Sequence, residues 1–477
     1  MSEVREMQME AIPSDSNDNN VNVSTSESDD DMVSGISSDE DWDCSIGLEW
    51  YQAAFSMVVV VIGAGVMALP QLPTKGGLIT SFIIMVACAA TITESGLGMW
   101  KGIMAGNGSK KNTPGMMKIV SYEDFGRTAL GEPGEIVVVV VQVFFYLGIA
   151  ASFSVLIADA VSHLSQKWLS PEDWLLPLFP LFALMSLLPN VSAVAKLVPL
   201  AVFCVVALCS LIVLKAAMDS QRWQEWPDIE PGSLHHMWPT KFMDVGSVVA
   251  TCFGAFGVNG NVPSILCEMK DQRKFPLAFK TAMTTVFVIY AAVMGVGYWG
   301  YGQFIQPDIV KSLTSFPDSY NQALHVPYKQ WTGPKAKALE YILSSLLLVK
   351  LLVGLPLNLM VIFYSLQTFK YTRNYVPAGT WANKAMRVVI VALALAIARA
   401  VTNFGTLFAL VCSVFGPLMQ CLMPLGFSYL IRKNVAGRPS SAYRRVLHAF
   451  LCMVALFTLT IGFWDSLQPV IHPKAAA

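Results

Sequence analysis

Long apolar stretches separated by short polar loops make up most of the chain from about residue 46 onward. The first of them, residues 51–74, carries no charged side chain. At about 1.5 Å of rise per residue, a helix of this length exceeds the roughly 30 Å apolar core of a bilayer. The same pattern predicts eleven membrane-spanning helices, at residues 51–74, 77–99, 134–162, 173–189, 193–217, 243–268, 276–304, 337–368, 383–401, 404–431 and 444–464. The sequence therefore predicts an all-α polytopic membrane protein.

Two of these spans are interrupted near their centres by glycines followed by a proline. Gly63, Gly65 and Pro70 lie in the first span, and residues 252–263 repeat the pattern in the sixth. Glycine is a poor helix former and proline lacks an N–H donor, so both spans should loosen at membrane depth. Free backbone groups at that depth are tolerated only where they face protein or a cavity. Close packing through small residues would explain one such motif, but a recurrence five spans later is typical of the binding site of inverted-repeat transporters.

Composition supports the membrane class and argues against several others. Apolar residues make up 54% of the chain and charged residues 14%, which is well below the usual quarter in soluble domains. The sequence has no basic stripe or recognition motif for nucleic acid, and no nucleophile, base and orienting group at the spacing of an enzyme. It shows no filter-like repeat or charged ring of a channel. We expect no cofactor and no metal site.

The first 45 residues differ in character from the rest. They are rich in serine, aspartate, glutamate and asparagine, which predicts a disordered acidic tail. Most lysines and arginines of the short loops fall on the side of this tail, so the N-terminus is predicted to be cytosolic and, after eleven spans, the C-terminus extracytosolic. The predicted organisation is a tail at 1–45, a transmembrane domain at 46–467 and a short C-terminal tail at 468–477. No sorting motif distinguishes the plasma membrane from a vacuolar or lysosomal membrane.

Together, the motifs and their order resemble the amino acid/auxin permease family of the APC superfamily. Residues 63–70 are similar to the family's helix 1 signature, and residues 253–257 followed by Pro263 are similar to its helix 6 signature. Residues 401–405, leading to Pro424, resemble its helix 9 to helix 10 signature. The resemblance covers residues 46–465. It implies a five-plus-five inverted-repeat fold, LeuT-like, with helix 11 added, and secondary active transport of amino acids by symport with a proton or sodium ion.

The breaks themselves suggest how an amino acid binds. A zwitterion requires N–H groups for its carboxylate and carbonyl oxygens for its ammonium group, and the two ends of a broken helix offer both. The predicted substrate-binding residues are Gly63, Ala64, Gly65, Val66, Tyr146, Ser152, Phe253, Gly254, Ala255, Phe256 and Asn259. For Tyr146 and Ser152, ordinary helix packing is the alternative interpretation.

Three charged residues inside predicted spans, Glu94, Asp159 and Lys350, are candidates for ion coupling, because charges at membrane depth are costly and often functional. Lys350 lies about midway through the eighth span; the alternative is a structural ion pair. Sodium-coupled relatives tend to have an asparagine where this chain has Val59, and some have a hydroxyl residue where it has Leu355. The loss of these side-chain oxygens weakens a site for a hard cation. Proton coupling is therefore the leading prediction and sodium coupling the alternative.

A function of a different class is also compatible with the sequence. The same pocket in a membrane receptor would sense an amino acid, and the acidic tail at residues 1–45 would signal to a partner. Deleting the tail tests the receptor hypothesis. Loss of partner binding with transport left intact would support it, and unaltered interactors would count against it.

Overall fold

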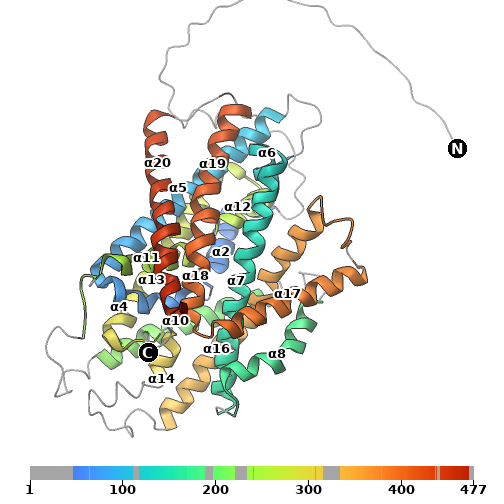
Figure 1. Cartoon of the computed structure of the whole chain (residues 1–477). Helices are drawn as coiled ribbons and strands as arrows, with labels where there is room; N and C mark the ends of the chain where they lie inside the picture. Colours follow the sequence, from blue (N-terminus) through green and yellow to red (C-terminus); the bar gives the residue numbers. More distant parts are fainter. Residues whose placement is uncertain are drawn as a thin grey trace, which may run out of the picture. The chain divides into compact units, whose positions relative to one another are not determined.

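The fold is described from a computed structural model, shown in Figure 1. The structure describes residues 47–63, 65–110, 118–166, 168–187, 197–220, 234–239, 241–306, 308–314, 334–377, 379–435, 437 and 441–471. All of them belong to one compact unit, residues 42–477. The predicted acidic tail at residues 1–45 lies outside the described residues, and so does Ala64, one of the predicted binding residues.

The described part of the chain is helical, with one isolated β-bridge between Leu48 and Met269. The α-helices are α2 (Trp50–Val61), α3 (Gly65–Ala68), α4 (Leu72–Gly76), α5 (Leu78–Lys110), α6 (Tyr122–Leu130), α7 (Glu132–Leu164), α8 (Pro171–Ser186), α10 (Val198–Ser220), α11 (Val245–Ala255), α12 (Val262–Glu268), α13 (Phe275–Tyr301), α14 (Ile309–Thr314), α16 (Pro334–Thr368), α17 (Trp381–Ala400), α18 (Phe404–Pro417), α19 (Met423–Leu430), α20 (Ala442–Phe457) and α21 (Phe463–Ile471).

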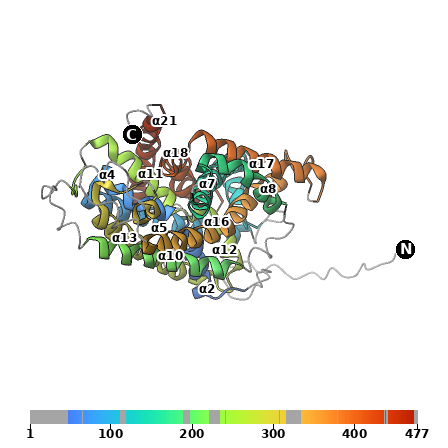
Figure 2. The ribbon, with the colours of Figure 1, turned by 90° about the horizontal axis from the view of Figure 1, so that it is seen from below.

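Most of these helices suit a bilayer by length and apolarity. Within the described ranges, nine helices qualify singly, and a pair bent by 54°, Trp50–Val61 with Gly65–Gly76, brings the number of candidate spans to ten. The predicted polytopic all-α class is confirmed. The remaining predicted span, 173–189, corresponds to α8, which at 16 residues is shorter than the other spans and contains Pro177 and Pro180. In both views α8 and α17 lie beside α7 (Figures 1 and 2).

Helix 1 is broken after Val61. It consists of α2, α3, the 3₁₀ turn η1 (Leu69–Gln71) and α4. The N–H of Ile62 still donates to Val58 O at 3.0 Å, but that of Gly63 turns to Val61 O at 2.7 Å instead of the residue four positions back. Pro70 lies in η1 and Pro73 in the first turn of α4, where a missing N–H costs little because the first N–H groups of a helix have no partner within it.

Helix 6 is broken after Ala255. It consists of α11, the 3₁₀ turn η4 (Asn259–Asn261) and α12. Gly257 donates to Gly254 O at 3.1 Å, so the α-helical pattern has ended there. The second half starts at Val262, with Pro263 in its first turn. Both breaks thus fall on the glycine and proline motifs at which the sequence predicts them.

Helix 10 is also irregular. Between α18 and α19 lies a π-helical segment, η8 (Leu418–Leu422), which directly follows Pro417. Tyr122 OH donates to Met419 O at 3.0 Å, and Ser95 Oγ donates to Gln420 O at 2.5 Å. Side chains from α5 and α6 therefore satisfy carbonyl groups that the irregular turn exposes, as membrane depth requires.

A histidine outside the spans, in the loop 234–239, gives a testable stability effect. His235 stacks on Trp299 with ring centroids 4.7 Å apart, and its Nε2 lies 2.9 Å from Trp299 O. Burial holds the pKa of His235 below its ordinary value of 6.5. Below that value the unfolded chain binds more protons at this position than the folded one, so His235 lowers stability as the pH falls.

We expect the melting temperature of the purified protein to fall less between pH 7.5 and pH 5.5 when His235 is replaced by glutamine, which does not titrate. Every other titratable residue is the same in both proteins. The difference between the two melting curves therefore isolates His235. Parallel curves for the wild type and the variant would contradict this account of the loop.

Candidate functional site

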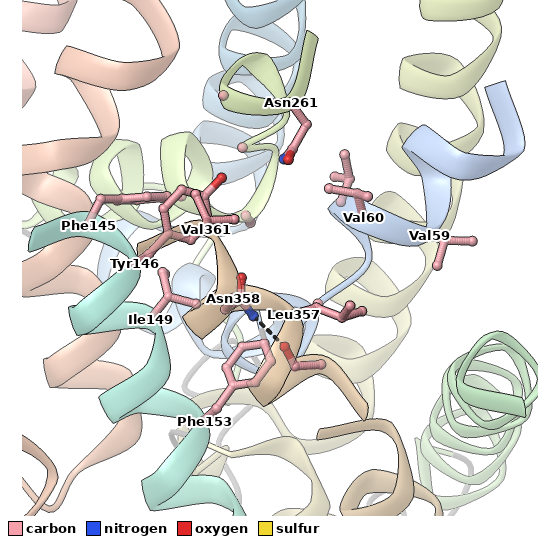
Figure 3. A pocket seen from close by; sticks show the side chains of 18 of the residues that line it. Val59, Val60, Phe145, Tyr146, Ile149, Phe153, Asn261, Leu357, Asn358 and Val361 are labelled. Carbon is pink, nitrogen blue, oxygen red and sulfur yellow. Dashed lines mark hydrogen bonds between the residues drawn. The ribbon is translucent and has the colours of Figure 1, made fainter. Parts of the chain in front are cut away.

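A cavity of about 340 Å³ lies where the breaks of helix 1 and helix 6 meet. Its lining comes from helix 1, α7, α10, helix 6, α16 and helix 10. Figure 3 shows Val59 and Val60 of α2 on one side of it, the side chains of α7 on another and those of α16 between them. The size falls in the usual range for small-ligand sites, roughly 300 to 1,000 Å³.

The helix breaks contribute mainly glycine to the wall. Gly63 and Gly65 line the cavity from helix 1, and Gly254, Ala255 and Gly257 line it from helix 6. The two breaks touch each other, because a Cβ added at Gly65 would lie 2.9 Å from Ala255 Cα. Glycine at these positions lets both main chains approach each other and lets a ligand reach backbone atoms.

Apolar side chains form the opposite walls. Phe145, Tyr146, Ile149 and Phe153 follow one face of α7 at helical spacing, and Val353, Leu357 and Val361 follow one face of α16. Asn358, between them, donates its Nδ2–H to Gly354 O at 3.0 Å, the bond drawn in Figure 3. Most of a bound solute would therefore meet hydrocarbon, with few polar groups to orient it.

The cavity reaches beyond the helix breaks toward the N-terminus of α2. On the side where α2 begins, Phe55 and Ser56 still line it. On the other side, no residue of α7 beyond Phe153 and none of α18 before Phe408 belongs to the lining. Phe153 packs on Gly354, where an added Cβ would lie 2.9 Å from the ring, and Phe408 lies 3.2 Å from the Cβ position of Gly65. These two rings bound the cavity on the side opposite the N-terminus of α2.

Lys350 is the one charged residue in the described lining. It lies on α16, one turn before Val353, between α2 and α10. Among the described residues, no hydrogen bond or ion pair joins its ammonium group to a carboxylate. The described part of the chain therefore does not contain the structural ion pair that was the alternative interpretation of Lys350. The described lining of the cavity thus contains a single charged side chain, and its other polar side chains, such as Asn261, Asn358 and Gln420, are uncharged.

The other two ion-coupling candidates lie elsewhere. Glu94 of α5 faces α20, where His448 Nε2 is 3.4 Å and Arg444 Nε is 3.8 Å from its Oε1. Asp159 of α7 is buried, with 5% of its surface exposed, and does not line the cavity. The structure brings only Lys350 of the three to the site.

Some of the predicted binding residues line the cavity and others do not. Those that line the cavity are Gly63, Gly65, Tyr146, Gly254 and Ala255; those that do not are Val66, Ser152, Phe253, Phe256 and Asn259. Ser152 donates to Gly148 O within α7 at 2.9 Å, as in ordinary helix packing. Asn259 turns away to Ser95 Oγ at 2.7 Å, and the ring of Phe256 packs against Tyr290 with centroids 5.0 Å apart. Helix 6 therefore contributes main chain to the cavity more than side chains.

Two residues that the sequence did not single out hold the breaks in place. Tyr290 OH of α13 lies 2.8 Å from Val61 O and 3.1 Å from Ala255 O, so one phenol bridges the ends of α2 and α11. Gln420 Oε1 of η8 accepts from the N–H groups of Val258 and Asn259, at 3.1 and 3.0 Å. Part of the helix 6 backbone is thereby already bonded. Pro424 entered the sequence analysis only as part of the resemblance in helix 10, and no local signal pointed to Gln420.

Solved structures of transporters share this fold. The chain aligns with MhsT in complex with L-phenylalanine over 88% of its own length and 99% of that chain, with a TM-score of 0.54 and 13% sequence identity. It aligns with Mhp1, a nucleobase-cation-symport-1 family transporter in a closed conformation with bromovinylhydantoin bound, over 91% of its length and 94% of that chain, with a TM-score of 0.53 and 13% identity. The predicted five-plus-five inverted-repeat fold is confirmed at the level of these matches.

No curated protein sequence matches the chain. The family described as "Transmembrane amino acid transporter protein" matches residues 47–468, which include nearly every described helix. The chain therefore belongs to the transmembrane amino acid transporter family.

Proposed function

We propose that this protein carries amino acids across a membrane by alternating access around the cavity between helices 1 and 6, driven by a proton gradient. The observation that supports this proposal most is the position of the cavity: two broken helices meet there with glycine main chain on both sides. A ligand of zwitterionic charge requires backbone donors and acceptors at short range, and broken helices at membrane depth supply them.

The substrate's ammonium group has acceptors at the end of α2. Val59, Val60 and Val61 line the cavity, and the turn of Gly63 toward Val61 O leaves Val59 O without its usual N–H partner. Its carboxylate would take the N–H groups at the start of the second half of helix 1, near Gly65, where the helix dipole favours a negative charge. The apolar faces of α7 and α16 would surround the side chain.

Lys350 is the residue that we propose for proton coupling. An ammonium group at membrane depth without a nearby carboxylate is costly, and lysine relieves this cost by releasing its proton. Binding and release of a proton at Lys350 would then accompany the change between the two accessible states. A sodium site is disfavoured because Val59 and Leu355 bring no side-chain oxygen to this region, and because a protonated lysine repels a cation.

With a cytosolic N-terminus, the side toward which the cavity extends would be the cytosolic side, and the conformation would be an inward-facing one. Phe153 and Phe408 would form the closed outer barrier, and opening would require them to separate from Gly354 and Gly65. The host membrane is the plasma membrane or a vacuolar or lysosomal one.

Uptake by purified protein in proteoliposomes tests the function. Each proteinogenic amino acid is supplied in radioactive form, with an imposed pH gradient, with a sodium gradient and with neither. We expect accumulation of at least one amino acid with the pH gradient alone. Accumulation only with sodium would overturn the proton coupling, and no gradient-dependent uptake of any amino acid would overturn the function.

A further inference from the structure

Gln420 lies in the π-helical segment η8 of helix 10. Only 1% of its surface is exposed, yet it belongs to the cavity lining. An amide side chain has one acceptor oxygen and one nitrogen with two N–H donors. When such a group is buried, each of these atoms requires a partner, and the missing partner identifies what the site is built to bind.

The oxygen of this amide is fully used. Gln420 Oε1 accepts from the N–H groups of Val258 and Asn259, at 3.1 and 3.0 Å. This assigns the amide unambiguously, because the reverse orientation would place Nε2 against two donors. The main chain of Gln420 is fixed as well: its carbonyl oxygen accepts from Ser95 Oγ at 2.5 Å and from Asn259 Nδ2 at 2.7 Å.

The nitrogen, in contrast, lies on the cavity side. A Cβ built on Gly257 would lie 3.2 Å from Gln420 Nε2, and Gly257 itself lines the cavity. Within the described ranges, no acceptor is hydrogen-bonded to Nε2. A rigidly held donor therefore faces the space in which a solute would bind.

We propose that Gln420 Nε2 donates a hydrogen bond to the carboxylate of the bound amino acid. This inference rests on the function proposed above. The carboxylate is the one acceptor that every amino acid zwitterion has, since its ammonium group only donates. The N–H groups of Val258 and Asn259 are not available to the substrate, because both donate to Oε1. The amide thus accepts two hydrogen bonds from helix 6 and presents an N–H donor to the cavity. Such chains of hydrogen bonds polarise and strengthen one another.

The test replaces Gln420 by glutamate and by methionine. Glutamate keeps an oxygen for Val258 and Asn259 but puts a negative charge where the donor was, so the KM for amino acid uptake should rise at least about tenfold with a much smaller change in maximal rate. Methionine keeps the length and has neither group. Ser413→Ala serves as the control, because Ser413 is buried in the same helix and bonds only to Leu410 O, at 2.7 Å.

Specificity distinguishes contact with the substrate from a merely structural role. Inhibition of uptake by the amino acid is compared with inhibition by its α-carboxamide, which has no negative charge and has an N–H₂ donor group in place of one of the two acceptor oxygens. The preference for the acid over the amide should be highest in the wild type, lower in Gln420→Met and lowest in Gln420→Glu, with about a tenfold loss between the extremes. Melting temperatures in detergent show whether each variant is folded.

An unchanged preference in whichever variant is folded would overturn the assignment while leaving transport by the wild type, and hence the proposed function, intact. If the wild type itself transports no amino acid, both are overturned.

Discussion

Uptake should fall roughly a hundredfold when Gly65 is replaced by alanine. The added Cβ would lie 2.9 Å from Ala255 Cα, 3.0 Å from Ala255 Cβ and 3.2 Å from Phe408 Cζ. Two of these atoms belong to the other broken helix and cannot rotate away, so the breaks must move apart. A displacement of about 1 Å in a positioned site is enough for an effect of this size.

Gly295→Ala is the matched control for this prediction. Gly295 lies in α13, another long membrane helix, and an added Cβ there meets nothing within 4 Å. We expect uptake by this variant to stay within about twofold of the wild type, because alanine also favours the helix. If Gly65→Ala transports as well as Gly295→Ala, the contact between the two breaks does not matter for transport.

Replacing Lys350 by methionine should abolish accumulation driven by a pH gradient. Methionine has a similar length but cannot bind a proton. A gradient of one pH unit is worth about 1.4 kcal/mol, or about tenfold accumulation for one proton per amino acid. We expect the accumulation ratio of the variant to fall to about one, while exchange of labelled for unlabelled amino acid continues, because the helix breaks remain intact.

Lys280→Met is the control for the loss of a lysine charge outside the cavity. Lys280 is exposed on α13 and does not line the cavity. Its variant should accumulate amino acid like the wild type. Accumulation by Lys350→Met with the normal dependence on the pH gradient would show that the proton binds elsewhere, and would direct attention back to Glu94 or Asp159.

The helix breaks could be predicted from the sequence because their causes are local. Glycine and proline act on the backbone wherever they occur, so Gly63, Gly65 and Pro263 marked the interruptions without knowledge of any partner. The apolar lengths of the other spans are local in the same sense. The short α8, Pro171–Ser186, likewise lies close to the predicted span 173–189, although it contains two internal prolines.

The cavity itself could be predicted only in part. Which face of helix 6 meets solute depends on packing against other helices, and Phe256 and Asn259 turned toward Tyr290 and Ser95 instead. Gln420 and Tyr290 act on backbone groups far away in the sequence, which no motif along the chain reveals. Glu94 is an isolated charge along the sequence. In the fold it lies beside His448 and Arg444 of α20.

The most direct test of the account is an experimental structure with a transported amino acid at saturating concentration. We predict its density between Gly63 and Gly65 of helix 1 and Gly254 and Ala255 of helix 6, with its side chain between α7 and α16. A transported amino acid bound anywhere else, with unbroken helices filling this space, would contradict the account.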